Sequence, residues 1–405
     1  MIIEFVIENT LSINSRLVLN FEESEFTSNT VQIGNKFISK IKCIYGENGT
    51  GKTNIIQAVD FYLSFMLNSF SELNPDESTH FIPFQFNELS QKKVGFFSIS
   101  FFVDEIRYDY EITLNKQEVI LEKLYFSPNG QKALLYYRES DEIKWGTSFS
   151  GAKKLIANAT RRNSSILSVG AQLNNPILLS IYTSIKKWYK GIISPEKSTL
   201  TGYTLARIEE NEDFKTEVIK LLHEINNSNI TNIKIQSKPI PLEYLEDLPP
   251  EIKNTILKRN SSPKNRKAIL IHSYDKEYDL PLELESRGTQ RLLELATPIY
   301  DLTHTHSFLM MDELETSLHP KIQKYFISQF LANNMNSQLL LTTHNIDLMD
   351  SGIFTDPEIC FALKDSKGNT NLYAVNDYTG VRKGVSRKHM YENGKFNKLP
   401  SKVRK

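Results

Sequence analysis

Hydrophobic and polar residues alternate through the first part of the chain, as in IIEFVIEN (residues 2–9) and RLVLNFEE (residues 16–23). A mainly apolar run, KFISKIKCIY, then leads into a glycine-rich turn that begins at residue 46. Alternation with a period of two is typical of half-buried strands, whereas a mainly apolar run is typical of a buried strand. Residues 53–70 instead place apolar side chains three or four positions apart, so we expect a long helix there.

The rest of the chain shows three further patterns. Residues 93–138 alternate again and carry a turn at Ser127-Pro128-Asn129-Gly130, which predicts an antiparallel meander. Residues from about 150 to 260 are polar with helical spacing, and prolines interrupt them, so no continuous coil is predicted. Beyond residue 267, short apolar strands such as AILIHSY and SFLMM alternate with helices, an arrangement typical of a parallel sheet.

These patterns predict an α/β fold: a mixed sheet that contains the glycine-rich turn, an antiparallel β subdomain, and an inserted, mainly helical lobe. We expect a first half at 1–150, the inserted lobe at 151–267, a second half at 268–376 and a basic tail at 377–405. The chain balances 48 Lys and Arg against 48 Asp and Glu, so net charge predicts no polyanionic partner. We expect a cytoplasmic protein with two buried free thiols, because no leader or membrane-spanning run is evident.

The glycine-rich turn reads GENGTGKT and fits the phosphate-binding pattern G-x-x-x-x-G-K-[ST] between a strand and a helix. Glycines let backbone N–H groups converge on phosphate oxygens at the N-terminus of the helix. We expect Lys52 to reach the β- and γ-phosphates of ATP and Thr53 to bind Mg²⁺. The alternative is a plain strand-turn-helix with a chance lysine. The candidate nucleotide-binding residues are Gly46, Glu47, Asn48, Gly49, Thr50, Gly51, Lys52, Thr53 and Asn54.

Two later strands end in polar residues that complete this chemistry. Asp312 and Glu313 follow SFLMM, so Asp312 is a candidate Mg²⁺ ligand and Glu313 a candidate general base, unless the pair only caps the next helix. His344 follows a second strand, where it is placed to sense the γ-phosphate, although a lone histidine is more often structural. Gln85, after the first helix, is a weaker candidate, because a solvent-facing glutamine is almost as good an interpretation. The candidate catalytic residues are therefore Glu313, His344 and Lys52.

This combination of motifs resembles the ABC-type ATPases. In that superfamily a signature turn of one subunit completes the nucleotide site of another, and Ser286-Arg287-Gly288-Thr289-Gln290 occupies its place here. The resemblance implies that Ser286 and the Gly288 amide face the γ-phosphate held by a second protomer. Arg287 and Thr289 stand where the commonest signature has other residues, which weakens that expectation. The resemblance also implies a head-to-tail homodimer, or a higher homo-oligomer, with shared ATP sites.

The run Asp312-Glu-Leu-Glu-Thr-Ser-Leu-His-Pro320 is similar to the non-transporter branch that includes RecF, the SMC proteins and the OLD nucleases. The stretch between the two halves is too short for the long arm of an SMC protein. About 60 residues follow His344, too few for the Toprim nuclease domain of an OLD protein. The resemblance is closest to the stand-alone AAA/ABC-like ATP-binding proteins of bacterial abortive-infection and related anti-phage loci. It includes the ending Tyr391-x-x-Gly394-Lys395-Phe396.

Such proteins act with a separately encoded effector, often a Toprim-type nuclease. We therefore expect an ATP-hydrolysing dimer switch that is the sensor or regulator subunit of an anti-phage system and controls this effector. One alternative is a RecF-like DNA-repair ATPase that binds DNA directly, and another is a nucleotide-dependent scaffold that hardly hydrolyses ATP. The basic C-terminal residues either contact phosphate backbone or form a solvated tail.

Overall fold

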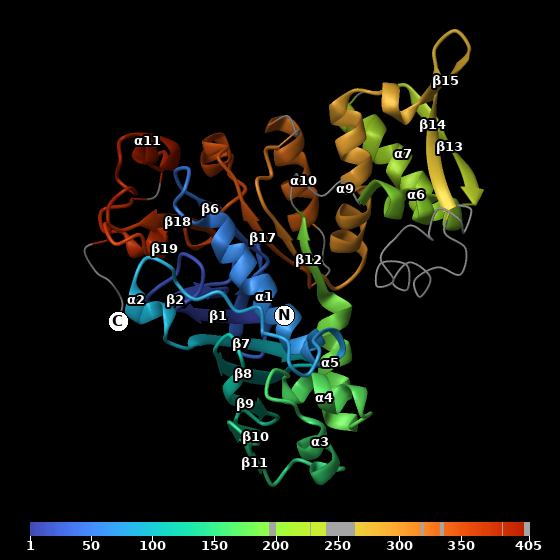
Figure 1. Ribbon diagram of the computed structural model, residues 1–405. Coiled ribbons are helices and arrows are strands. Elements are labelled where there is room, and N and C mark those ends of the chain that lie inside the picture. Colours follow the sequence, from blue (N-terminus) through green and yellow to red (C-terminus); the bar gives the residue numbers. More distant parts are fainter. Residues whose placement is uncertain are drawn as a thin grey trace. The chain divides into compact units, whose positions relative to one another are not determined.

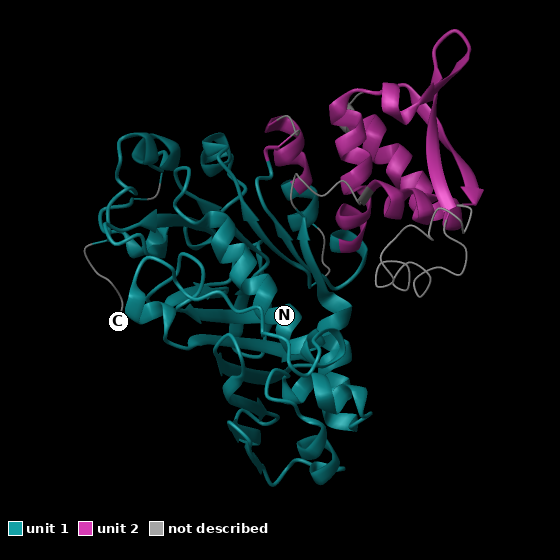
Figure 2. Ribbon diagram, in the orientation of Figure 1, with its two compact units in different colours: residues 1–194, 302–314, 327–405 teal, residues 195–301, 315–326 magenta. Residues whose placement is uncertain are grey.

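The computed structural model describes residues 1–193, 200–226, 228–239, 264–316, 320–332, 336–382 and 384–400 (Figure 1). The chain divides into two compact units (Figure 2). Unit 1 comprises Met1–Ser194, Leu302–Leu314 and Ile327–Lys405, and unit 2 comprises Pro195–Asp301 and Glu315–Phe326. The helices among the described residues are too short or too polar to span a bilayer.

The predicted meander is confirmed as an antiparallel sheet of unit 1 with the strand order β11-β10-β9-β8-β7-β1-β2. The turn between β9 and β10 lies where it was expected, and Gly130 adopts a left-handed φ of 77° there, which glycine tolerates without a steric cost. The strands are β1 (Ile2–Glu8), β2 (Leu17–Asn20), β7 (Gly95–Val103), β8 (Ile106–Leu114), β9 (Val119–Ser127), β10 (Ala133–Glu139) and β11 (Glu142–Trp145).

The second sheet of unit 1 is the predicted mixed sheet, with the order β12-β16-β17-β6-β18-β19. Neighbours from β12 to β18 pair in parallel, and β19 pairs antiparallel with β18. The carboxyl ends of β6, β16 and β17 therefore meet at one edge of the sheet. The strands are β6 (Ile41–Tyr45), β12 (Tyr189–Ile193), β16 (Phe308–Met311), β17 (Gln338–Thr342), β18 (Ile359–Lys364) and β19 (Thr370–Ala374). A small sheet joins β3 (Glu22–Glu23), β5 (Lys36–Ser39) and β4 (Thr30–Ile33).

The predicted long helix is α1 (Lys52–Glu72), which packs against both sheets (Figure 1). On the antiparallel side, Tyr62 stacks on Phe97 of β7 with ring centroids 5.4 Å apart. On the other side, Met310 and Leu340 of the parallel sheet belong to the same buried cluster as the helix. Because α1 begins directly after the glycine-rich turn, this core fixes the position of that turn.

The inserted lobe begins later in the chain than the predicted residue 151. Helices α3 (Lys153–Ala159), α4 (Ile166–Gln172) and α5 (Pro176–Trp188) belong to unit 1, because their apolar side chains are buried in its core. The Ile166 N–H donates to Oε1 of the fully buried Glu122 at 2.9 Å, and burial raises the pKa of that carboxyl. After α5 the chain enters β12, a strand of the parallel sheet that the pattern did not predict.

Unit 2 contains helices and an antiparallel sheet. The strand predicted at AILIHSY is β14 (Lys264–Ser273), and it pairs with β13 (Ile230–Pro239) and β15 (Glu277–Pro281), not with the parallel sheet of unit 1. The boundary expected at residue 268 therefore falls inside unit 2, because β14 and the helix after it stay with this sheet. The helices are α6 (Leu200–Glu210), α7 (Glu212–Asn226) and α9 (Arg287–His304), whose last three residues belong to unit 1, with the 3₁₀ turn η2 (Leu282–Leu284). Helix α10 (Pro320–Ala332) is divided between the units.

The predicted basic tail is folded onto unit 1 as far as residue 400. Phe396 is fully buried and stacks on Phe361 of β18 with ring centroids 4.3 Å apart. Tyr378 donates its hydroxyl to the Phe396 carbonyl at 3.2 Å. The aromatic residues of this segment pack it against β18. The tail contains α11 (Arg387–Glu392) and begins at the end of η5 (Val375–Asp377). Unit 1 also contains the short helices α2 (Glu88–Gln91), η3 (Ile346–Asp350) and η4 (Asp356–Glu358).

Candidate nucleotide-binding site

The glycine-rich turn follows β6 and curls back into α1. Gly49 and Gly51 have left-handed φ angles of 77° and 98°. A Cβ on Gly51 would lie 2.2 Å from Thr370 Oγ1 and 2.6 Å from Ser12 Oγ, so only glycine fits there. Gly51 is also the N-cap of α1, and in the described structure no side chain makes a capping hydrogen bond there. The turn is therefore shaped by its glycines and presents the N-terminus of a long helix.

Lys52 extends back across this turn. Its side chain is buried, and its Nζ donates to the carbonyl oxygens of Gly46 at 2.9 Å and Glu47 at 3.1 Å. Thr50 closes the turn further, since its hydroxyl donates to the Glu47 carbonyl at 2.9 Å. The ammonium group is thus held against the backbone of the loop.

Thr342, the last residue of β17, links the end of this strand to the candidate carboxylates Asp312 and Glu313, which follow β16. Its hydroxyl donates to Asp312 Oδ1 at 2.5 Å and accepts from the Glu313 N–H at 2.9 Å. Asp312 is only 9% exposed, whereas the Glu313 side chain is exposed and its backbone φ is 51°. A left-handed φ is uncommon outside glycine and often accompanies a functional position. Helix α10 begins only at Pro320, so the pair does not cap it.

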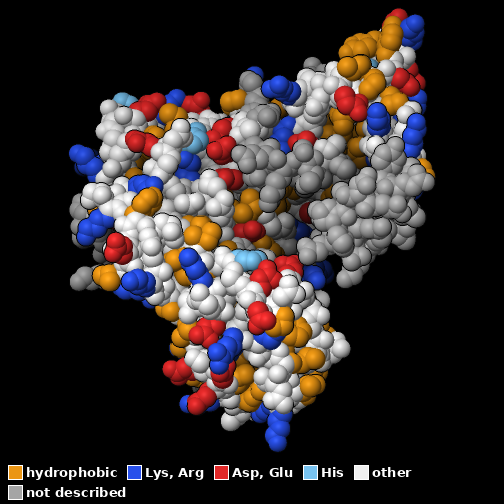
Figure 3. Space-filling model, viewed as in Figure 1, with side chains coloured by type: hydrophobic (Ala, Val, Ile, Leu, Met, Phe, Trp, Pro, Cys, Tyr) orange, Lys and Arg blue, Asp and Glu red, His pale blue; other side chains and the backbone are white. Residues whose placement is uncertain are grey.

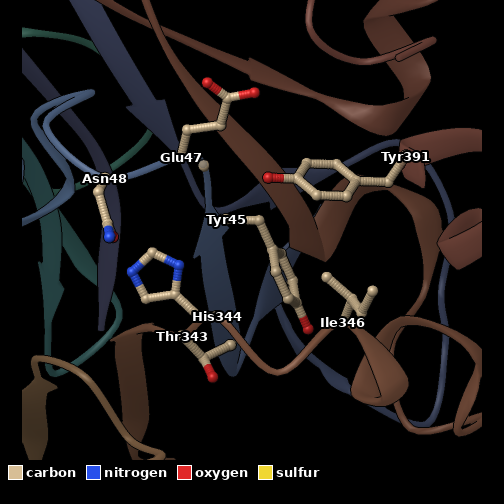
Figure 4. Close-up of a pocket in the computed structure, with 8 residues that line it drawn as sticks. Tyr45, Glu47, Asn48, Thr343, His344, Ile346 and Tyr391 are labelled. Carbon is tan, nitrogen blue, oxygen red and sulfur yellow. The ribbon is translucent and has the colours of Figure 1, made fainter. Parts of the chain in front are cut away.

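His344 follows β17 and lines a cavity of about 270 Å³ with the glycine-rich turn, residues 46–53, which we call the P-loop. Figure 4 shows the His344 ring pointing toward Asn48 from one side of this cavity. From the other side comes Tyr391, whose hydroxyl points toward the backbone of Glu47. A second cavity of about 270 Å³ is lined by Gly46 to Thr50, Phe361, Leu363, Lys364, Tyr391 and Asn397. The structure thus brings the P-loop and His344 together at the edge where the parallel strands end.

The remaining predicted residues do not line these two cavities. Gln85 is exposed, and its Nε2 donates to the Pro83 carbonyl at 2.6 Å. Ser286 and Gly288 lie in unit 2, where Ser286 Oγ accepts from the Thr289 N–H at 3.1 Å and so caps α9. Ser317 to His319 of the run that follows Glu313 lie outside the described residues.

The family comparison agrees with this geometry. Residues 41–350 match the family model described as an AAA domain, putative AbiEii toxin, Type IV TA system. The chain belongs to this family. A search of the curated proteins found no match.

Solved structures of SMC heads share a general likeness with the chain. The SMC head domain from Thermotoga maritima is 12% identical, with 92% of this chain and 98% of that chain covered and a TM-score of 0.42. An Smc head with an extended coiled coil, bound to the C-terminal domain of ScpA derived from Pyrococcus furiosus, is 14% identical, with 98% and 99% covered and a TM-score of 0.39.

Mg²⁺ fits the residues that this member of the family presents. Among the described residues, no three His, Cys, Asp or Glu side chains come together as a ready metal cage. Mg²⁺ is commonly held by one or two protein oxygens together with phosphate oxygens and water. The Thr53 hydroxyl and the Asp312 carboxylate are ligands of that kind, so the residues fit a metal that arrives with a nucleotide.

Sequence patterns missed several residues that build the site. Lys364 donates to the Gly49 carbonyl at 3.0 Å, and the Thr370 hydroxyl donates to the Thr50 carbonyl at 2.8 Å. Asn397 Nδ2 donates to Glu47 Oε1 at 3.2 Å. These contacts join residues more than 300 positions apart, and only the order of strands brings them together. Tyr391 was visible as part of a motif, but nothing in the sequence placed it beside the P-loop.

Proposed function

We propose that the protein is an ABC-type ATPase that works as an ATP-dependent dimer switch. The observation that carries this proposal is the convergence of Lys52, the Asp312–Thr342–Glu313 cluster and His344 at the carboxyl edge of one parallel sheet. Binding and metal-assisted hydrolysis of a nucleoside triphosphate need a cation, a Mg²⁺ ligand, a base and a γ-phosphate sensor, and these residues supply that set.

Each residue of this set has one task in the proposed reaction. Bound Mg²⁺·ATP supplies the phosphoanhydride bond and the charge that polarises it. Lys52 and the N–H groups at the start of α1 bind phosphate oxygens, while Asp312 and Thr53 orient the metal. Glu313 accepts a proton from the attacking water. Its side chain is exposed in the single protomer, so it replaces bulk solvent as the proton acceptor only when the site closes.

We propose that a second protomer closes the site. Ser286 and Gly288 stand at the N-terminus of the 18-residue helix α9, a position suited to an anionic group. Ser286 is exposed, so a partner's nucleotide can reach it. Two equivalent composite sites then form in a symmetric dimer, and ATP links the protomers until it is hydrolysed.

The family's description suggests what the switch controls. It names a putative toxin of a type IV toxin–antitoxin system. We propose that this protein is the sensor or regulator subunit of an anti-phage, abortive-infection system, and that it acts on a separately encoded effector such as a Toprim-type nuclease. Co-purification of the protein with the products of neighbouring genes, with and without ATP, tests this part. If none of these products binds the protein in a way that depends on ATP, the proposal is contradicted.

Glu313→Gln tests the enzymatic part of the proposal. We expect ATP turnover to fall by about 100-fold or more, because a general base contributes that much, while ATP binding remains. The trapped ATP should raise the dimer fraction measured by light scattering. Unchanged turnover would show that Glu313 is not the base.

Direct DNA binding, as in a RecF-like repair ATPase, is the second candidate. Some of the basic C-terminal side chains are already paired: Arg387 with Asp356 at 2.7 Å and Lys388 with Asp347 at 2.6 Å. On the face shown in Figure 3, basic and acidic side chains of the described residues are interspersed. Neither observation favours a phosphate-backbone surface. DNA-stimulated ATPase activity with a steep salt dependence would reverse this preference.

A further inference from the structure

The C-terminal motif Tyr391-x-x-Gly394-x-Phe396 has a defined geometry. The N–H groups of Gly394 and Lys395 donate to the carbonyls of Tyr391 at 2.9 Å and Met390 at 3.0 Å, and Gly394 has a φ of 70°. These bonds are the Schellman arrangement that ends a helix with a left-handed residue. The reversal directs Tyr391 and Phe396 to the same place, since both rings stack on Phe361, at 5.6 and 4.3 Å.

This packing places the motif against the P-loop. Phe361 lies on β18, directly beside Tyr45, the residue before Gly46. Tyr391 lines both cavities that flank the loop. Asn397, immediately after Phe396, donates to the Glu47 carboxylate at 3.2 Å. The C-terminal segment is therefore a direct neighbour of the P-loop.

The start of the same segment holds the stretch that follows His344. The N–H groups of Arg387 and Lys388 donate to Asp350 Oδ1 at 2.7 and 3.3 Å, and the Ser386 hydroxyl donates to Asp350 as well. Asp350 ends η3, the 3₁₀ turn that begins two residues after His344. Lys388 Nζ also pairs with Asp347 of this turn at 2.6 Å.

We propose that residues 386–397 form a C-terminal clamp that holds the P-loop and residues 344–350, the His344 loop, at a fixed separation. Tyr391 is then a positioning residue of the nucleotide site. The proposal deepens the function given above, because an ATPase needs these two loops at a fixed separation around the terminal phosphate.

Variants of this segment in the full-length protein test the clamp. In Tyr391→Ala we expect hydrogen–deuterium exchange to accelerate in peptides covering residues 45–51 and 344–350. We also expect the Kd for Mg²⁺·ADP and the KM for ATP to rise roughly tenfold, because a loosened loop pays the ordering cost on binding. Tyr391→Phe keeps the ring on Phe361 and should restore both readouts. Lys398→Ala, which removes an exposed side chain directly after the clamp, is the matched control.

Asn397→Ala provides a milder test, because Asn397 is exposed and its loss leaves the aromatic packing intact. We expect faster exchange in the P-loop peptide alone. Unchanged exchange of residues 45–51 in folded Tyr391→Ala and Asn397→Ala proteins would overturn the clamp. A wild-type protein that neither binds nor hydrolyses ATP would overturn the proposed function, while the exchange measurement would still decide the clamp.

Discussion

Two helix N-termini in this chain are built in opposite ways. α1 begins at a left-handed Gly51 without a capping side chain in the described structure, and its loop wraps back over it through Lys52. α9 begins beside Ser286, which caps the helix with its own hydroxyl and remains exposed. The first arrangement is suited to enclosing a phosphate group, whereas the second is suited to meeting one that arrives from outside. The contrast supports one protomer holding ATP and the other completing the site.

The largest effect is expected at the enclosed helix start. Lys52→Ala removes the cation that the P-loop carbonyls now hold. We expect ATP hydrolysis to fall by more than about 100-fold, because removal of a single preorganised charge-stabilising group costs that much. A coupled phosphate-release assay checks the rate, and calorimetry with ATP checks binding. Near-normal hydrolysis would show that the start of α1 does not enclose the phosphate group of ATP.

A smaller effect is expected when the backbone of the same helix start is changed. Gly51→Ala forces a Cβ to within 2.2 Å of Thr370 Oγ1 at a φ of 98°, so we expect a loss of about 2 to 4 kcal/mol in the free energy of unfolding. Gly202→Ala is the matched control, since a Cβ there meets nothing within 4 Å inside α6. The control should be neutral or stabilising by up to about 1 kcal/mol. Equal effects in urea unfolding would contradict the strained geometry at Gly51.

The smallest effect is expected at His306, just after the C-terminal end of α9. This residue affects stability in acid and is part of neither helix start. Burial, with the nearby Met1 amino group and Lys187, lowers the pKa of His306 from 6.5 to about 4. Below pH 6.5 His306 binds a proton in the unfolded chain but not in the folded protein, so the contribution of His306 to stability is constant above that pH and falls between 6.5 and about 4. In wild type we expect His306 to lower the free energy of unfolding by about 1 to 3 kcal/mol between pH 6.5 and 4, and in His306→Gln we expect this decrease to be absent. Urea unfolding at several pH values measures it. An unchanged slope would show that His306 is not the group responsible.

The sequence predicted the parts of the molecule whose signals are contiguous. Gly46 to Thr53, α1 and the meander each depend on neighbouring residues, and all were found where expected. The strand β14 was also found, but its pairing was not, because period-two alternation does not identify a partner. The C-terminal segment was misjudged for a related reason. Its charge is visible in the sequence, but the burial of Phe396 against β18 depends on a contact between distant residues.

The central claim is that one protomer's P-loop and another's Ser286 make one active site, and mixing two inactive variants tests it most directly. Lys52→Ala and Ser286→Arg should each abolish ATP hydrolysis alone. Mixed in equal amounts, half of the dimers contain one intact composite site, so we predict recovery of roughly a quarter of wild-type activity. No recovery, with heterodimers confirmed by differently tagged chains, would contradict the shared site.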